Sequence, residues 1–149
     1  MKKQNPWISL SEEEKNQIFN FSESYKKFIS KFKTEREVTS YALDKAKKKG
    51  FIDAEEKKNL IPGDKIFYTC REKTAAFAII GKNPIENGMN LIVSHTDSPR
   101  LDAKPSPISE ENELAFLKTN YYGGIKKYQW LSTPLSIRGV VFLKKWRKS

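Results

Sequence analysis

An apolar run that stops at a histidine constrains the fold of this chain more than any other feature. Residues 89–94, Met-Asn-Leu-Ile-Val-Ser, place three large aliphatic side chains in succession, at Leu91, Ile92 and Val93. Side chains alternate between the two faces of a strand, so consecutive apolar residues predict a strand that is covered on both sides. Such a strand lies inside a sheet that is flanked by other layers. We therefore predict an α/β fold with residues 89–94 as an interior strand.

Two helices with matching start signals precede this run. Ser11-Glu-Glu-Glu14 and Thr34-Glu-Arg-Glu37 both have the form of a capping box, in which a hydroxyl and a glutamate satisfy free amides of the first turn. Apolar residues recur at helical spacing behind each box, and Gly50 provides a stop for the second helix. We predict two amphipathic helices, one behind each box.

Short strands are predicted for much of the remaining sequence. Residues 65–69 and 74–80 are joined by a short polar connection, which predicts a hairpin. Beyond Pro105 and Pro107 the pattern changes to short apolar stretches separated by glycine and proline, and we predict strands there at residues 113–118, 121–124 and 135–143. We place a domain boundary near residue 105, so that residues 1–104 and 105–149 form two parts.

The charge of the chain limits its partners. It has 28 basic and 18 acidic residues, a formal net charge of +10, which is high enough to raise nucleic-acid binding as a hypothesis. The lysines occur singly or in short groups on predicted helices and turns, without a basic face, so we predict no nucleic-acid partner.

No apolar stretch of about 18 residues exists, and Cys70 is the single cysteine. We predict a cytoplasmic protein without a membrane partner.

His95 and Asp97 are the candidate functional residues. They follow the predicted interior strand directly, and open α/β sheets bind ligands beyond the ends of their strands. Their side chains project from the same side of an extended segment, where a carboxylate can orient an imidazole that binds a metal. The same three residues are also typical of an ordinary hydrogen-bonded histidine at the rim of a sheet. The spacing alone leaves both interpretations open.

Longer strings resemble a known family. NLIVSHTDSPRLDAKPSP, residues 90–107, and TNYYGGIKKYQWLSTPLSIRGVV, residues 119–141, resemble the N-terminal part of the aspartyl aminopeptidase or aminopeptidase I family of dinuclear zinc exopeptidases. Residues 25–51 and 71–82 are similar to the family's opening helix pair and first hairpin. The resemblance implies the N-terminal part of a three-layer α/β/α sandwich. It also implies that residues 105–149 begin an inserted β-rich domain, which caps the active site and joins subunits.

The resemblance implies a role for each candidate residue. His95 is implied as a ligand of one of two adjacent zinc ions, and Asp97 as the active-site acid that orients or tunes that ligand. Members of the family remove acidic or neutral N-terminal residues from peptides, and full-length members form homo-oligomers. The implied chemistry is a pair of zinc ions that lowers the pKa of a bridging water and polarises the scissile carbonyl.

The sequence holds an incomplete set of metal ligands. A two-zinc centre needs about five or six protein ligands, mostly histidine and carboxylate, whereas His95 is the only histidine here. We interpret the downstream carboxylates, Asp102, Glu110, Glu111 and Glu113, as solvated residues. We therefore expect an N-terminal fragment that has no peptidase activity alone and tends to aggregate. Two alternatives are a non-catalytic module that associates with full-length subunits and a basic nucleic-acid-binding domain.

The basic end of the chain has an interpretation at the level of the gene. Residues 144–149, Lys-Lys-Trp-Arg-Lys-Ser, break the strand pattern abruptly. An adenine-rich stretch can encode them, and loss of one adenine changes the reading to Lys-Asn-Gly-Glu-Lys-Val, in which Asn-Gly is a strong hairpin signal. We expect a frameshift here, so the shifted frame should continue into further aminopeptidase-like sequence.

Overall fold

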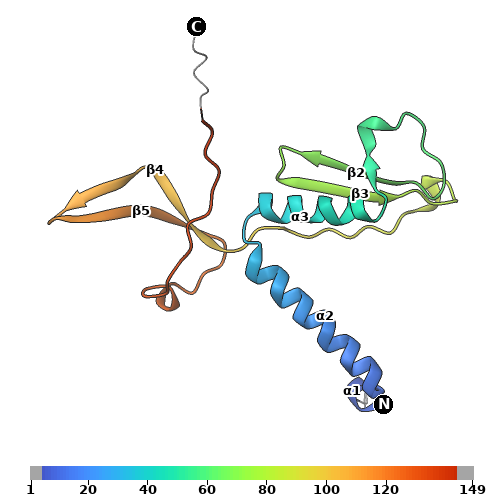
Figure 1. Ribbon diagram of the computed structural model, residues 1–149, viewed down its shortest axis with the longest axis horizontal. Helices are drawn as coiled ribbons and strands as arrows, with labels where there is room; N and C mark the ends of the chain where they lie inside the picture. Colours follow the sequence, from blue (N-terminus) through green and yellow to red (C-terminus); the bar gives the residue numbers. More distant parts are fainter. Residues whose placement is uncertain (1–4, 144–149) are drawn as a thin grey trace, which may run out of the picture. The chain divides into compact units, whose positions relative to one another are not determined.

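The structure is a computed structural model that describes residues 5–143, and the expectation for residues 144–149 lies outside them. Contacts within the chain divide it into two units, Met1–Asp97 and Ser98–Ser149. The first unit combines helices with a small sheet and the second contains a two-stranded hairpin (Figure 1). The fold is thus mixed α/β, as predicted. The helices are α1 (Pro6–Ser9), α2 (Glu12–Lys31) and α3 (Glu35–Lys48).

The two predicted helices are confirmed, each with its capping box. The Ser11 hydroxyl accepts a hydrogen bond from the amide of Glu14 at 3.2 Å, and the Glu14 carboxylate accepts one from the amide of Ser11 at 2.8 Å. The bonds that Ser11 donates to this carboxylate, the backbone one first, lower the pKa of Glu14. Thr34 and Glu37 form the equivalent box on α3. Among residues 5–143, no helix combines the length and the apolar content needed to cross a bilayer.

The cap of α3 provides a local test of this structure. Replacing Thr34 with alanine should destabilise the first unit by about 1 kcal/mol, because it removes the hydroxyl that accepts the amide of Glu37 at 3.3 Å. Ser40→Ala, at an exposed position within the same helix, is the matched control and should be neutral or slightly stabilising. Urea unfolding followed by far-UV circular dichroism measures both. Equal losses in the two variants would contradict the capping role.

The first sheet has three strands in the order β1-β2-β3, namely β1 (Ile52–Asp53), β2 (Lys65–Cys70) and β3 (Thr74–Ile79). β2 and β3 form the predicted hairpin, in which Phe67 pairs with Phe77, and β1 runs parallel to β2. The turn residues Arg71 and Glu72 have φ values of 52° and 58°. Arg36 on α3 binds this turn, with its guanidinium 2.8 Å from the Glu72 carboxylate. The predicted hairpin is therefore confirmed, and its turn is held by Arg36 on α3.

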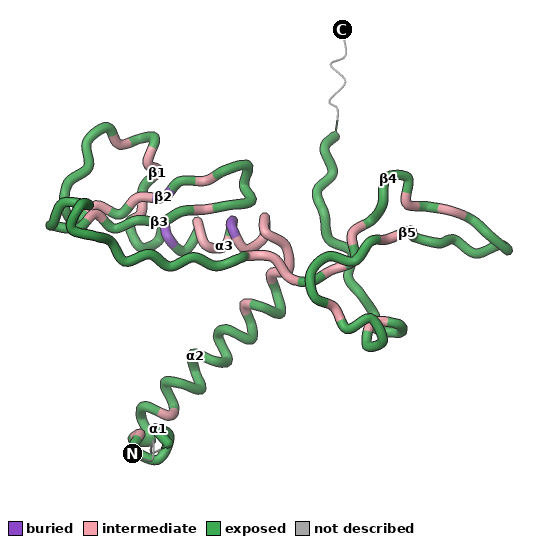
Figure 2. The backbone as a smooth tube through the Cα atoms, turned by 180° about the vertical axis from the view of Figure 1, so that it is seen from behind, coloured by how far each residue is buried: buried purple, intermediate pink, exposed green. Residues whose placement is uncertain are grey.

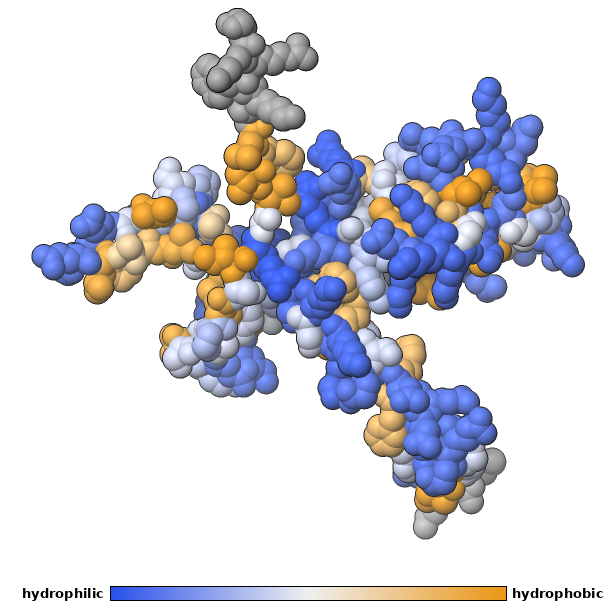
Figure 3. Space-filling model, viewed as in Figure 1, coloured by the Kyte–Doolittle hydropathy of each residue, from blue (hydrophilic) through white to orange (hydrophobic). Residues whose placement is uncertain are grey.

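The buried core of the described chain is small. Among residues 5–143, only Thr39 and Ala46 on α3 and Phe67 on β2 are buried (Figure 2). Aromatic rings join the end of α2 to α3, since the Phe32 and Tyr41 ring centroids lie 4.5 Å apart. Many large apolar residues are instead exposed, and apolar surface is visible on both units in Figure 3. The first unit thus depends on a narrow contact between α3 and the sheet.

The second unit contains one long hairpin, which the sequence predicted only in part. β4 (Arg100–Glu111) pairs antiparallel with β5 (Leu114–Tyr122), and Asn112 and Glu113 form the turn with φ of 53° and 64°. The strands predicted at residues 113–118 and 121–124 are one continuous strand. Residue 105, near which the sequence predicts a domain boundary, lies inside β4. Pro105 and Pro107 predict a break in the strand, yet β4 continues past both. They lie where the register shifts, and such bulges tolerate proline.

Two predicted strands are wrong. Residues 89–94 and 135–143 adopt no strand structure, and neither stretch pairs with another strand among residues 5–143. The expected interior positions Leu91, Ile92 and Val93 are 74%, 96% and 81% exposed. A strand exists only where a neighbouring strand accepts and donates its backbone hydrogen bonds. The apolar pattern is present in both stretches, but the described part of the chain places no pairing strand beside either one.

Candidate functional site

His95 and Asp97 lie close together in the segment between β3 and β4. The His95 side chain is 85% exposed and that of Asp97 is 19% exposed. The Nδ1 atom of His95 is 3.1 Å from the backbone carbonyl oxygen of Asp97 and 3.7 Å from the carboxylate oxygen Oδ1. The structure therefore brings the two predicted residues into contact. The closer group is the backbone carbonyl, whereas the spacing of the two residues predicts a contact with the carboxylate.

The contact with the carbonyl selects one form of the imidazole. A carbonyl oxygen can only accept a hydrogen bond, so Nδ1 carries the proton that is donated to Asp97. In the neutral ring the lone pair then resides on Nε2. Metal-binding histidines commonly have this arrangement, in which one ring nitrogen donates to a carbonyl or carboxylate and the other binds the metal. His95 is thus held in a form that suits a metal ligand.

The His95 imidazole can supply one ligand to a zinc ion. A neutral imidazole nitrogen is among the preferred ligands of zinc, together with thiolate and carboxylate. Within residues 5–143, no group of three histidine, cysteine, aspartate or glutamate side chains is arranged to hold a metal ion. Cys70 is exposed at the end of β2. Asp102 pairs with Arg100 at 2.7 Å. The described residues therefore supply one part of a metal centre.

A glycine contact fixes the backbone that begins the second unit. Gly123 has a φ of 78°, and a Cβ atom at this position would lie 3.4 Å from Cα of Pro99. The turn after β5 thus approaches the residue that precedes β4 closely, with Arg100 stacked 3.9 Å from the Tyr122 ring. From the sequence, Pro99 predicts a stiff segment and Gly123 an ordinary turn, and neither residue predicts this contact. The signal that could have revealed the contact was the Gly-Gly pair after two tyrosines.

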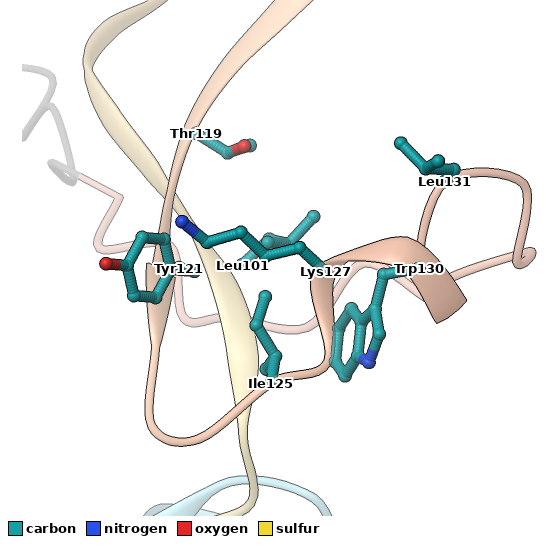
Figure 4. Close-up of a pocket in the computed structure, with 7 residues that line it drawn as sticks. All are labelled: Leu101, Thr119, Tyr121, Ile125, Lys127, Trp130 and Leu131. Atoms are coloured by element: carbon teal, nitrogen blue, oxygen red, sulfur yellow. The ribbon is translucent and has the colours of Figure 1, made fainter.

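The second unit also has a shallow apolar hollow (Figure 4). The ammonium group of Lys127 lies 4.2 Å from the centroid of the Tyr121 ring, a cation–π contact at the edge of this hollow. None of the lining side chains is a carboxylate, imidazole or thiol, so the hollow lacks the usual ligands of a metal ion. Its lining residues are Leu101, Thr119, Tyr121, Ile125, Lys127, Trp130 and Leu131.

Comparison with known proteins identifies the family of the chain. The aminopeptidase I zinc metalloprotease family (M18) matches residues 28–149. A probable M18 family aminopeptidase 1 from Borrelia garinii subsp. bavariensis is 96% identical over 148 residues, which are 99% of this chain and 32% of the relative. An aspartyl aminopeptidase from Dictyostelium discoideum is 32% identical over 78% of this chain and 25% of the relative.

A solved structure shows the same relationship. The crystal structure of aminopeptidase I from Borrelia burgdorferi B31 matches with a TM-score of 0.84 and 90% identity, over 88% of this chain and 32% of that chain. The chain spans about a third of the length of the curated relatives it matches. The matched range includes α3, both sheets, His95 and Asp97. The resemblance found in the sequence is therefore confirmed, and the chain belongs to the aminopeptidase I zinc metalloprotease (M18) family.

Proposed function

We propose that this chain carries the first zinc ligand of an M18 aminopeptidase and has no peptidase activity by itself. The observation that supports this most directly is the geometry of His95, whose Nδ1 faces the Asp97 carbonyl at 3.1 Å and leaves Nε2 as the metal-binding atom. The family supports zinc as the metal. Because one imidazole cannot hold a catalytic zinc pair, the remaining ligands have to come from outside residues 5–143.

The roles of the two residues follow from their contacts. His95 binds zinc through Nε2, and Asp97 holds the imidazole in the required tautomer and orientation. When bound, a zinc pair activates water for attack on the peptide carbonyl. We propose peptides with an acidic or neutral N-terminal residue as substrates, which the likeness to an aspartyl aminopeptidase supports. His95 and Asp97 take no part in recognising the substrate side chain in this proposal.

We also propose a domain architecture, an oligomeric state and a cellular compartment for the protein. The catalytic three-layer sandwich, predicted for residues 1–104, ends before β4 in this proposal. The inserted β-rich lid domain, predicted for residues 105–149, begins with β4, because β4 and β5 form one hairpin from Arg100 onward. The full-length protein is a homo-oligomer without nucleic-acid or membrane partners. The free thiol of Cys70 supports a reducing compartment, which we propose to be the cytoplasm.

A chimera tests this function. Residues 1–143 of this chain would replace the matching third of the Borrelia burgdorferi aminopeptidase I. We expect the chimera to bind zinc and to release the N-terminal residue of glutamyl or aspartyl peptides, because it restores the missing ligands. We expect the 149-residue chain to show no turnover with the same substrates and zinc supply. Peptide hydrolysis and zinc content measure both, and turnover by the isolated chain would refute the proposed inactivity.

A second candidate function is a non-catalytic module that associates with full-length subunits. The exposed apolar side chains of Leu91, Ile92 and Val93 favour this function, because exposed apolar stretches mark interaction sites. This function predicts that the isolated chain copurifies with full-length enzyme and leaves its zinc content unchanged.

A further inference from the structure

The loop that follows β3 contains an asparagine directly before a glycine, at Asn87 and Gly88. Asn87 is the last residue of a single turn of 3-10 helix (Ile85–Asn87), and both Asn87 and Gly88 are exposed. Among residues 5–143, no hydrogen bond or ion pair engages the carboxamide of Asn87. The Cγ atom of this side chain is therefore accessible to a nucleophile from the neighbouring backbone.

The backbone at Gly88 supplies such a nucleophile. Its φ is 104°, in the region that favours glycine, and a Cβ atom placed there would have no contact within 4 Å outside the adjoining residues. The Gly88 amide donates to the carbonyl oxygen of Ile85 at 2.9 Å, and the Asn87 amide donates to that of Pro84 at 3.1 Å. A short exposed turn of this kind opens at a low cost in free energy. Opening releases the Gly88 nitrogen beside the Asn87 side chain.

We propose that Asn87 and Gly88 form a self-modification site, at which the asparagine is converted to aspartate and isoaspartate through a succinimide ring. The Gly88 nitrogen attacks Cγ of Asn87 and forms a new N–Cγ bond. The bond from Cγ to Nδ2 breaks, and ammonia leaves with the proton that the Gly88 nitrogen gives up. Water then opens the ring. Attack of water at the Cγ carbonyl gives aspartate, whereas attack at the α-carbonyl gives isoaspartate, in which the main chain continues through Cγ.

Other asparagines in turns of this chain lack a feature that the reaction needs. Asn83 lies in the same loop, but Pro84 follows it and has no amide hydrogen to lose. Asn112 lies in an exposed turn with a φ of 53°, but the side chain of Glu113 hinders the approach of the next nitrogen. Asn87 is the only asparagine in the sequence that precedes a glycine. The chemistry therefore selects this position.

The modification changes the segment that leads from β3 to His95. The new carboxylate removes one unit from the formal net charge of +10. Isoaspartate also lengthens the main chain by one carbon atom at Asn87, shortly before residues 89–94 and His95. The reaction consumes only water, so the modified fraction is expected to rise with the age of the protein. The site needs no metal ion and does not depend on the proposed function.

Ageing the purified 149-residue chain at mildly alkaline pH and physiological temperature tests the proposal. Cation-exchange chromatography should resolve a less basic form that accumulates with time. Electron-transfer fragmentation of its peptides should identify both aspartate and isoaspartate at residue 87. We expect modification of Asn87 to be at least about tenfold faster than that of Asn83, Asn90 or Asn112, because glycine alone leaves the approach to Cγ open. The rate should rise with pH, since the attack requires loss of the Gly88 amide proton.

Two variants complete the test. Asn87→Gln keeps a carboxamide but would have to close a larger, less readily formed ring, so the less basic form should disappear while circular dichroism is unchanged. Asn112→Gln is the matched control and should leave the rate at Asn87 unaltered. The proposal fails if Asn112 reacts as fast as Asn87, or if Asn87→Gln still yields the less basic form. Aspartate without isoaspartate would indicate direct hydrolysis and would also overturn it, and none of these readouts involves zinc or peptidase activity.

Discussion

Replacing His95 with alanine in the chimera is expected to reduce peptide hydrolysis by at least about a hundredfold and to lower zinc content. Mutating a residue that only hydrogen-bonds a metal ligand typically lowers metal affinity or activity by roughly 10- to 100-fold. Loss of the ligand itself should lower them by at least as much. The side chain is 85% exposed in this chain, and within residues 5–143 its one hydrogen bond joins Nδ1 to the Asp97 carbonyl. Removing it should therefore leave the fold intact.

Two comparisons separate a metal ligand from an ordinary rim histidine. Glu110→Gln removes a carboxylate from an exposed position on β4 that we interpret as solvated, and activity should stay within about a factor of two. Asp97→Asn keeps the backbone carbonyl that accepts from Nδ1, so it should retain more zinc than His95→Ala. Hydrolysis rates and zinc analysis by mass spectrometry measure all three variants. Unchanged zinc and activity in His95→Ala would exclude this residue as a ligand.

Replacing Phe67 with alanine should produce the largest loss of stability. Phe67 is 6% exposed, and with Ala46 it makes up the buried apolar core of the described residues. Phe67 pairs with Phe77 on the neighbouring strand, and the ammonium of Lys47 lies 5.6 Å from the centroid of the Phe67 ring. Truncating a buried phenylalanine costs about 3–5 kcal/mol. Because the core is so small, we expect this loss to abolish cooperative unfolding of the first unit.

The neighbouring residue provides the control for this prediction. Tyr68 lies on the opposite face of β2 and is 50% exposed, so Tyr68→Ala should cost less than about 1 kcal/mol. Urea unfolding followed by circular dichroism and tyrosine fluorescence compares the two variants with the unmodified chain. A similar loss in both would show that β2 does not pack through the face that carries Phe67.

The features that the sequence predicted well are those whose causes lie within a few residues. The capping boxes at Ser11 and Thr34 need only a hydroxyl and a glutamate three residues later. The hairpin of β2 and β3 needs a short turn between two strands of matching length. The contact between His95 and Asp97 is also local, because the two residues are separated by one position. Local geometry limits each of these to very few conformations.

The errors concern pairing between distant segments. Residues 89–94 and 135–143 have the apolar pattern of strands, yet neither has a strand beside it within the described residues. β4 contains two prolines that predict a break, yet it pairs with β5 on both sides of the bulge. Periodicity reports how one segment distributes its apolar side chains. It contains no information on whether another segment is available to form hydrogen bonds with it.

The sequence by itself determined the family, the two capped helices, the first hairpin and the pair of candidate residues, because each depends on local spacing or on a string of specific residues. Tertiary structure decided that Phe67 is buried whereas Leu91 is exposed. It also decided that the Asp97 carbonyl lies closer to Nδ1 of His95 than the Asp97 carboxylate does. The physical reason is that burial and hydrogen bonding are properties of neighbours in space. Which neighbours a residue acquires depends on how the whole chain packs.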